Sequence, residues 1–228
     1  MKIAVVTGGS DGIGKSTASA LSKSGYFVCL IARSEDRLKK TSKEIKNSAY
    51  YVCDICDSKK VEETIKQIVK KHKSIDVLVN DAGMWLEGEL DSHSADEIRK
   101  AMDTNATGHL FVTKETIPIM KKQKSGTIVN VISQAGLMGK EERIVYNAAK
   151  FAMTGATKCL QLDLRKHGIR VIGIYPAKVR TKLFEKVGIK KPMDNALTPE
   201  QVANAIMFAV SQPADVEISD IVLRNIFN

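Results

Sequence analysis

Short apolar runs alternate with longer amphipathic stretches along the whole chain. Most of the apolar runs are continuous in Val, Ile and Leu and lack polar alternation, which is typical of parallel strands covered on both faces. They predict seven strands, at Lys2–Thr7, Phe27–Ala32, Tyr50–Cys53, Val77–Asn80, Thr127–Ile132, Arg170–Tyr175 and Ile218–Leu223. The amphipathic stretches predict helices near residues 13–24, 35–46, 58–73, 94–123, 146–167 and 199–212.

Strands separated by helices predict one doubly wound α/β domain over residues 1–228, with a mostly parallel seven-stranded sheet and helices on both faces. No linker, shift in composition or internal repeat marks a second domain. The longest irregular stretch, residues 181–198, follows a late strand beyond its carboxyl end. A substrate lid is expected at that place, and the simpler alternative is a long surface loop.

The overall composition is that of an ordinary globular protein. Hydrophobic residues make up 43% of the chain and charged residues 27%, a balance that argues against disorder. No apolar run approaches the roughly 18 residues of a membrane helix, and the N-terminal apolar run is too short for a signal peptide. We therefore expect a soluble, cytoplasmic protein that has no membrane partner.

The formal net charge of +9 raises the question of an anionic partner such as nucleic acid. The lysines stand mostly in short pairs on predicted helix faces, such as Lys39-Lys40 and Lys121-Lys122, without interleaved aromatics. A solvated lysine-rich surface explains this pattern better than a nucleic-acid face.

Four cysteines are too few for a disulfide scaffold in a chain of this length. Cys53 and Cys56 have the C-x-x-C spacing of redox and zinc sites, but no second Cys/His pair accompanies them. We expect reduced structural thiols and no metal site.

A glycine-rich turn, Thr7–Gly14, joins the first predicted strand to the first predicted helix. Its glycines permit a tight turn, and the free N–H groups of the helix N-terminus attract phosphate, so the turn predicts a dinucleotide site. The second strand ends at Ala32-Arg33 without the acidic residue that binds the adenosine ribose of NAD. Arg33 can pair with a 2′-phosphate, which favours NADP over NAD, unless it merely begins the next helix.

Tyr146 and Lys150 are spaced i to i+4, which puts both on one face of a predicted helix. A phenol with an ordinary pKa near 10 exchanges protons poorly at neutral pH. A neighbouring ammonium favours the phenolate and is expected to lower this pKa. Taken alone, such a pair is more often a solvated surface pair than a catalytic one.

The order of several motifs resembles the short-chain dehydrogenase/reductase family, from Lys2 to about Leu223. The matching pieces are Thr7–Gly14, Asp54, Asn80-Asp81-Ala82-Gly83, Asn105, Ser133, Tyr146 with Lys150, and Pro176–Thr181. The resemblance implies a Rossmann-type NAD(P)-dependent oxidoreductase; Arg33 favours NADP as the cofactor, with NAD possible. It also implies a homo-oligomer, a dimer or tetramer packed through helices 106–123 and 146–167.

The resemblance implies a role for each catalytic residue. Tyr146 would protonate the substrate carbonyl oxygen or deprotonate the alcohol, and Ser133 would hydrogen-bond and orient that oxygen. Lys150 would lower the Tyr146 pKa and hold the nicotinamide ribose. Asn105 would bend a helix and support a water in a proton relay to Lys150.

The resemblance also implies a set of residues that contact the cofactor. The pyrophosphate turn would be lined by Gly8, Gly9, Ser10, Asp11, Gly12, Ile13 and Gly14. The other implied contacts are Arg33, Asp54, Ile55, Asn80, Asp81, Ala82, Gly83, Tyr146, Lys150, Val179 and Thr181.

Two positions depart from the family pattern. Asp81 stands where the family has a second asparagine, and Ala177 stands where it has the glycine of Pro-Gly. If the family contact at 81 is a side-chain amide that donates to a neighbouring strand, Asp81 would lose that donor unless protonated. If the contact is the backbone carbonyl, the cofactor site survives.

We expect an NADP(H)-dependent oxidoreductase that interconverts a carbonyl and a secondary alcohol of a small molecule. A non-catalytic dinucleotide-binding regulatory or scaffold protein is the alternative. Trp85, Met138 and Phe184 suggest an apolar wall, and Lys140, Lys178 and Lys182 leave room for an acidic substrate. Small hydroxy acids or ketones and fatty-acyl carrier substrates both remain open.

Overall fold

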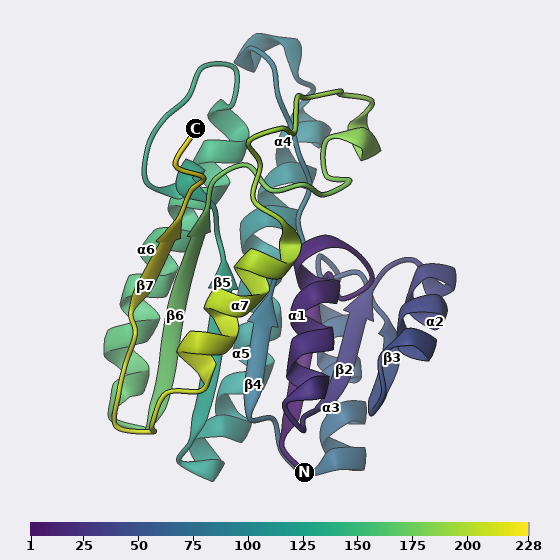
Figure 1. The fold of residues 1–228 in the computed structure, drawn as a ribbon, viewed down its shortest axis with the longest axis vertical. Coiled ribbons are helices and arrows are strands. Elements are labelled where there is room, and N and C mark those ends of the chain that lie inside the picture. Colours follow the sequence, from purple (N-terminus) through teal and green to yellow (C-terminus); the bar gives the residue numbers. More distant parts are fainter. Residues whose placement is uncertain (228) are drawn as a thin grey trace.

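Seven parallel strands form one sheet in the order β3-β2-β1-β4-β5-β6-β7 (Figure 1). The computed structural model describes residues 1–227. The strands are β1 Ile3–Thr7, β2 Phe27–Ala32, β3 Ser48–Val52, β4 Val77–Asn80, β5 Gly126–Val131, β6 Ile169–Pro176 and β7 Asp220–Leu223. Every residue of β1, β4 and β5 is buried, which explains their unbroken apolar character. The doubly wound fold predicted from the sequence is confirmed.

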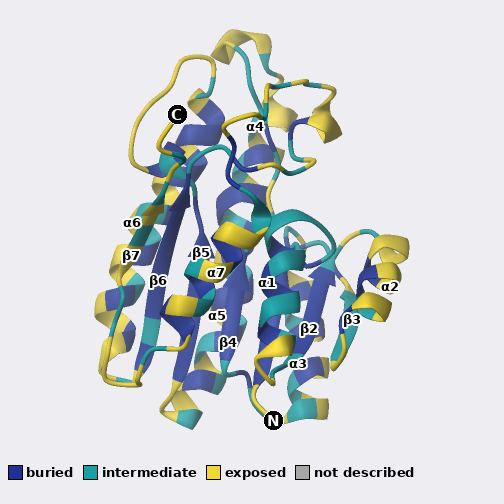
Figure 2. Ribbon diagram, viewed as in Figure 1, coloured by how far each residue is buried: buried dark blue, intermediate teal, exposed yellow. Residues whose placement is uncertain are grey.

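Helices cover both faces of the sheet (Figures 1 and 2). They are α1 Gly12–Lys23, α2 Glu35–Glu44, α3 Ser58–His72, α4 Ala95–Met102, α5 Gly108–Gln123, α6 Ile144–Arg165 and α7 Pro199–Val210. Buried side chains of α1, α2 and α7 form one core cluster with the strands, and those of α3, α5 and α6 form the cluster on the opposite face. Within residues 1–227, no helix combines the length and apolarity required to cross a membrane.

The strand order reverses between β1 and β4, which lie side by side although one lies far before the other in sequence. The loops that leave the carboxyl ends of these two strands therefore separate and leave a crevice between them. Ligands of open α/β sheets bind at such a switch point. The fold thus directs attention to the turns after β1 and β4.

The predicted helix over 94–123 is interrupted by one π-helical turn, Asp103–Thr107, between α4 and α5. A π turn inserts an extra residue into the helical repeat and is frequent at functional sites. The irregular stretch 181–198 contains a short 3₁₀ helix, Glu185–Val187, and its end pairs with the chain after β6 through a bridge between Val179 and Leu197. In Figure 1 this stretch lies beyond the carboxyl edge of the sheet.

Candidate active site and dinucleotide pocket

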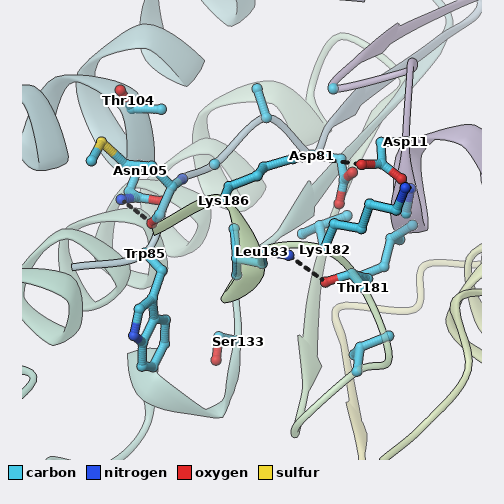
Figure 3. A pocket seen from close by; sticks show the side chains of 18 of the residues that line it. Asp11, Asp81, Trp85, Thr104, Asn105, Ser133, Thr181, Lys182, Leu183 and Lys186 are labelled. Atoms are coloured by element: carbon cyan, nitrogen blue, oxygen red, sulfur yellow. Dashed lines mark hydrogen bonds and ion pairs between the residues drawn. The ribbon is translucent and has the colours of Figure 1, made fainter. Parts of the chain in front are cut away.

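A cavity of about 600 Å³ opens at the carboxyl edge of the sheet. Its wall contains residues from the turns after β1, β2, β3, β4, β5 and β6 and from the stretch 181–198. In the close-up, Asp11 and Asp81 lie at one end of the pocket, and Trp85 and Ser133 lie toward the other (Figure 3).

The glycine-rich turn is shaped by close backbone approaches. Gly8 and Gly12 have φ of +68° and +54°, a region that side chains disfavour. A Cβ on Gly14 would lie 2.6 Å from the Gly8 carbonyl oxygen, so the first turn of α1 packs directly on the loop. The Asp11 carboxylate caps α1 by accepting a hydrogen bond from the Gly12 N–H at 2.8 Å.

The cavity wall after β2 includes Arg33, Ser34 and Arg37. The Arg33 guanidinium lies 3.9 Å from the Asp54 carboxylate, and both side chains are about half exposed. Asp54 also accepts a hydrogen bond from the Cys56 N–H at 3.1 Å. Two guanidinium groups are therefore available where the chain leaves the second strand.

Asp81 points its carboxylate at α1, where it accepts a hydrogen bond from the Gly14 N–H. Burial raises the pKa of Asp81 to about 7, against the lowering effects of that hydrogen bond and of Lys150 and Lys186. The side-chain contact to the neighbouring strand belongs to Asn80, whose amide donates to Asn130 in β5 at 2.9 Å. The replacement of amide by acid at position 81 therefore leaves the link between β4 and β5 intact.

Ser133, Tyr146 and Lys150 line the same cavity, and Ser133 and Lys150 both lie beside Tyr146. Ser133 follows β5 with φ of +145°, a strained conformation of the kind that accumulates at active sites. Tyr146 and Lys150 stand one turn apart on α6 and are only 6% and 4% exposed. The Lys150 Nζ lies 5.7 Å from the Tyr146 ring centroid and donates to the Val131 carbonyl oxygen at 3.4 Å.

The electrostatics of this trio differ from the sequence-based expectation. Burial raises the pKa of Tyr146 to about 12, although a hydrogen bond with Ser133 and the charge of Arg143 both act to lower it. Burial also lowers the pKa of Lys150 to about 8, against the attraction of Asp81. The prediction of a lowered Tyr146 pKa is therefore wrong for this structure, because desolvation of the phenolate outweighs the Ser133 hydrogen bond and the Arg143 charge.

Asn105 occupies the π turn and is fully buried. Its amide nitrogen donates to the carbonyl oxygens of Ala101 and Met84, and its amide oxygen accepts the Met84 N–H. The π turn lies at the place where a bend was predicted. The side chain of Asn105 joins the bent helix to the segment after β4.

His109 was not predicted from the sequence. Its Nε2 lies 2.6 Å from the Ala82 carbonyl oxygen, and burial lowers its pKa to about 3, so the ring is neutral. This contact connects the His109 ring to the segment that follows β4. Its position four residues after Asn105, on the same helix face, is the signal that could have identified it.

The other end of the cavity is aromatic and charged. The Trp85 ring lies 4.6 Å from the Tyr146 ring and 4.7 Å from the Phe184 ring, measured between centroids. Glu87 accepts from Lys191 at 2.6 Å and from Arg143 at 3.4 Å. The apolar wall expected at Trp85 and Phe184 is present, whereas the three charged residues were missed because they lie far apart in the sequence.

Nearly all predicted site residues share the cavity. The exceptions are Gly9, Gly14 and Asn80, which do not line it. Gly9 packs on Leu30, Gly14 packs on Gly8, and Asn80 joins two strands, so these three support the wall from behind. Ala177 donates its N–H to the Leu223 carbonyl oxygen and is not among the residues with positive φ, so its turn tolerates a Cβ.

The thiols of Cys53 and Cys56 are free, and burial raises the pKa of each. A raised pKa disfavours the thiolate that redox chemistry and metal binding require. No cluster of three or more His, Cys, Asp or Glu suited to a metal ion occurs in residues 1–227.

The geometry described above can be compared with known proteins. The family model described as short chain dehydrogenase matches residues 2–192. The chain belongs to this family. An uncharacterized oxidoreductase of Staphylococcus epidermidis is 30% identical to this short-chain dehydrogenase over 224 residues, which cover 98% of this chain and 96% of the relative.

Two solved structures resemble this short-chain dehydrogenase over nearly its whole length, each with 27% identity. One is an alcohol dehydrogenase from the archaeon Thermococcus sibiricus complexed with 5-hydroxy-NADP, with a TM-score of 0.92, covering 100% of this chain and 98% of that one. The other is the closed form of a serine dehydrogenase complexed with NADP⁺, with a TM-score of 0.93, covering 99% and 96%. The protein is an oxidoreductase of the short-chain dehydrogenase family.

The residues of this short-chain dehydrogenase fit a dinucleotide. The turn at Gly8 and Gly12 presents bare backbone where a side chain would be strained or crowded. The N-terminus of α1 attracts phosphate through its free N–H groups. Lys182 and Lys186 also line the cavity. The Lys186 Nζ lies 3.2 Å from the Asp11 carboxylate (Figure 3).

Proposed function

We propose that this short-chain dehydrogenase is an NADP(H)-dependent enzyme that interconverts a carbonyl and a secondary alcohol, with Tyr146 as the proton donor and acceptor. The observation that carries the proposal is the meeting of Ser133, Tyr146 and Lys150 in one cavity with the glycine-rich turn. Two relatives of known structure were solved with NADP or an NADP derivative, which supports the choice of cofactor.

Arg33 supports NADP over NAD. A guanidinium binds a phosphate through charge-assisted and often bidentate hydrogen bonds. Arg33 and Arg37 line the cavity after β2. Doubly wound dinucleotide folds hold the adenosine ribose at this place, where NAD sites have an acidic residue and NADP sites have an arginine. Asp54 holds Arg33 only loosely, at 3.9 Å, so the guanidinium is free to meet a 2′-phosphate.

When bound, the dinucleotide supplies or accepts the hydride. A Tyr146 pKa of about 12 keeps the phenol protonated at neutral pH, which is the form required to give a proton to a carbonyl oxygen. Ser133 holds the Tyr146 hydroxyl and can donate its own proton to the same oxygen. The buried Lys150 ammonium favours negative charge on Tyr146 at the moment when the proton leaves.

We propose that the stretch 181–198 acts as a substrate lid. Lys186 reaches Asp11 at the glycine-rich turn, and Lys191 reaches Glu87 after β4. Both contacts tie this stretch to other parts of the chain. The Lys186–Asp11 pair is partly exposed and therefore weak, whereas the Lys191–Glu87 pair is mostly buried, and opening of the lid would have to break both.

The test is Tyr146→Phe, which removes the phenolic proton and leaves the ring packed against Trp85. Loss of general acid–base catalysis should reduce kcat for carbonyl reduction by about 10²–10⁴-fold. The Kd for NADPH, measured by isothermal titration calorimetry, should change by less than about threefold. Tyr50→Phe, outside the cavity, is the matched control and should keep full activity.

Near-normal reductase activity in Tyr146→Phe would refute the catalytic assignment. If the wild type binds NADPH yet reduces no carbonyl in a broad panel, the non-catalytic binding protein becomes the better explanation.

A further inference from the structure

The charged residues of the cavity wall are separated by sign. The acidic residues among the described lining residues are Asp11, Asp54 and Asp81, and all three belong to the turns at the dinucleotide end. The wall around Tyr146 and beyond it contains cations instead, namely Lys140, Arg143, Lys178, Lys191 and Arg224. A substrate that enters this end therefore meets these cations, whereas the nearby Glu87 carboxylate is not among the described lining residues and is already paired with Arg143 and Lys191.

Arg143 is the cation placed closest to the chemistry along the chain. It immediately precedes α6, three residues before Tyr146, and its charge acts on the Tyr146 hydroxyl. Its guanidinium carbon lies 5.0 Å from the centre of the Trp85 ring, so the planar group is held against an aromatic face. The side chain is 26% exposed, which keeps it accessible from the cavity but partly shielded from water.

The guanidinium of Arg143 is incompletely used within the described residues. Its Nε makes one long contact, 3.4 Å, to Glu87 Oε1, and its two terminal nitrogens make no hydrogen bond to residues 1–227. Glu87 Oε1 also accepts from Lys191 at 2.6 Å. One carboxylate thus serves two cations, and the half-buried trio has a net charge of +1.

We propose that this end of the cavity is a carboxylate subsite, in which Arg143 binds the carboxylate of an oxo acid or hydroxy acid. The proposal rests on the proposed function, because it names the substrate class of the same reaction. The terminal nitrogens of a guanidinium form a fork that matches the two oxygens of a carboxylate. A single negative charge balances the trio of Glu87, Arg143 and Lys191, whereas a phosphate dianion would overcompensate it.

The aromatic residues complete the subsite. The Trp85 ring contacts the Tyr146 ring in a tilted arrangement and the Phe184 ring edge-on. Lys191 lies 5.1 Å from the centre of the Trp85 ring and 5.3 Å from that of the Phe184 ring. Phe184 and Lys191 belong to the stretch 181–198, so this stretch contributes directly to the substrate wall. A carboxylate bound at Arg143 would be held between the lid and the helix that carries Tyr146.

The alternative is that Arg143 and Lys191 only hold the loop against Trp85. The two roles make different predictions. A structural role affects all substrates alike, whereas a binding role affects only substrates with a carboxylate. Matched pairs of a hydroxy acid and its uncharged amide separate the two, because they share the reacting alcohol and almost the same shape.

The experiment measures kcat and KM with NADP⁺ for 2-hydroxybutanoate, 3-hydroxybutanoate and 4-hydroxypentanoate, each beside its carboxamide. For the wild type, kcat/KM of at least one acid should exceed that of its amide by tenfold or more. Arg143→Gln should reduce kcat/KM for that acid by about 10–100-fold, mainly through KM, as expected for a hydrogen-bonded charge. The value for the amide should change by less than about threefold.

Arg143→Lys and Arg99→Gln are the companion variants. Arg143→Lys keeps the charge but loses the fork, and should restore part of the affinity for the acid. Arg99→Gln removes one positive charge from the exposed face of α4, outside the cavity, and should leave every parameter unchanged.

Trp85 provides a readout that does not depend on turnover, because it is the chain's one tryptophan. Titration of the Tyr146→Phe variant with the preferred acid should change the fluorescence of Trp85. The same titration of the double variant Tyr146→Phe, Arg143→Gln should leave this fluorescence unchanged. The inference is overturned if every amide is used as well as its acid, or if Arg143→Gln affects both partners of a pair equally. If the enzyme turns over neutral ketones or amides without a preference for acids, the carboxylate subsite is refuted and the proposed function is not. If it turns over no substrate at all, both the subsite and the proposed function are refuted.

Discussion

Replacing Asp81 by Asn should stabilise the protein at pH 8 much more than at pH 5. The carboxylate is buried against α1, where it accepts the Gly14 N–H, and burial raises its pKa from 3.8 to about 7. An asparagine has nearly the same shape, its amide oxygen can accept the same hydrogen bond, and it has no charge to bury.

The sign follows from proton linkage. Between pH 3.8 and about 7 the folded protein holds a proton on Asp81 that the unfolded chain has lost, so the free energy of unfolding falls as the pH rises. At about 1.4 kcal/mol per pH unit, the full cost above pH 7 is about 4 kcal/mol. Solvent access to the half-buried residue reduces this figure.

The attraction between Asp81 and Lys150 is already part of this figure. The Asp81 carboxylate raises the pKa of Lys150 against burial, and the Lys150 ammonium in turn lowers the pKa of Asp81, so the value of about 7 includes it. Part of the cost is already present at pH 5, which lies above the unfolded pKa of 3.8. The advantage of the variant should therefore grow by about 1–3 kcal/mol between pH 5 and pH 8, less than the full cost.

The assay is urea unfolding of both proteins at pH 5, 6, 7 and 8, followed by far-ultraviolet circular dichroism. Asp91→Asn, which removes an exposed carboxylate from the short helix Leu90–Ser92, is the control and should show no such pH dependence. An advantage of Asp81→Asn that is constant over this range, or that shrinks toward pH 8, would refute the argument from burial.

Two further predictions concern the cofactor and the assembly. Arg33→Ala should weaken NADPH binding by about 10–100-fold in calorimetry, the usual effect of losing charge-assisted hydrogen bonds, while NADH binding stays the same; an equal loss for both would contradict the 2′-phosphate assignment. We also propose a homo-oligomer that packs through α5 and α6, because Leu110, Phe151 and Leu162 leave large apolar side chains exposed on these helices. Leu162→Asp, at a side chain that is 71% exposed, should reduce the mass measured by light scattering to that of a monomer; a wild type that is already monomeric would contradict the proposal.

The positions of strands and helices could be predicted because they depend on local periodicity. The strand limits agree to within about two residues; β3, for example, begins at Ser48 rather than at Tyr50. The helix over 94–123 was predicted without its division into α4 and α5 by the π turn. The hydrophobic pattern continues through this division, and only the resemblance at Asn105 indicated a bend.

The residues of the candidate site also fall into a group that local sequence predicts and a group that it does not. The glycine-rich turn and the pair Tyr146 and Lys150 are each contained in a few consecutive residues, so their spacing alone predicts their geometry. By contrast, Glu87 is 56 residues from Arg143 and 104 residues from Lys191, and no local pattern joins them.

The sequence by itself determined the doubly wound fold, the family and most of the residues that line the cavity, because strand burial, glycine turns and helical spacing are properties of neighbouring residues. The tertiary structure decided the direction of the Tyr146 and Asp81 pKa values and the assembly of Arg143, Glu87 and Lys191 beside Trp85. Desolvation and charge pairing depend on which distant segments pack together, and that is settled only when the chain has folded.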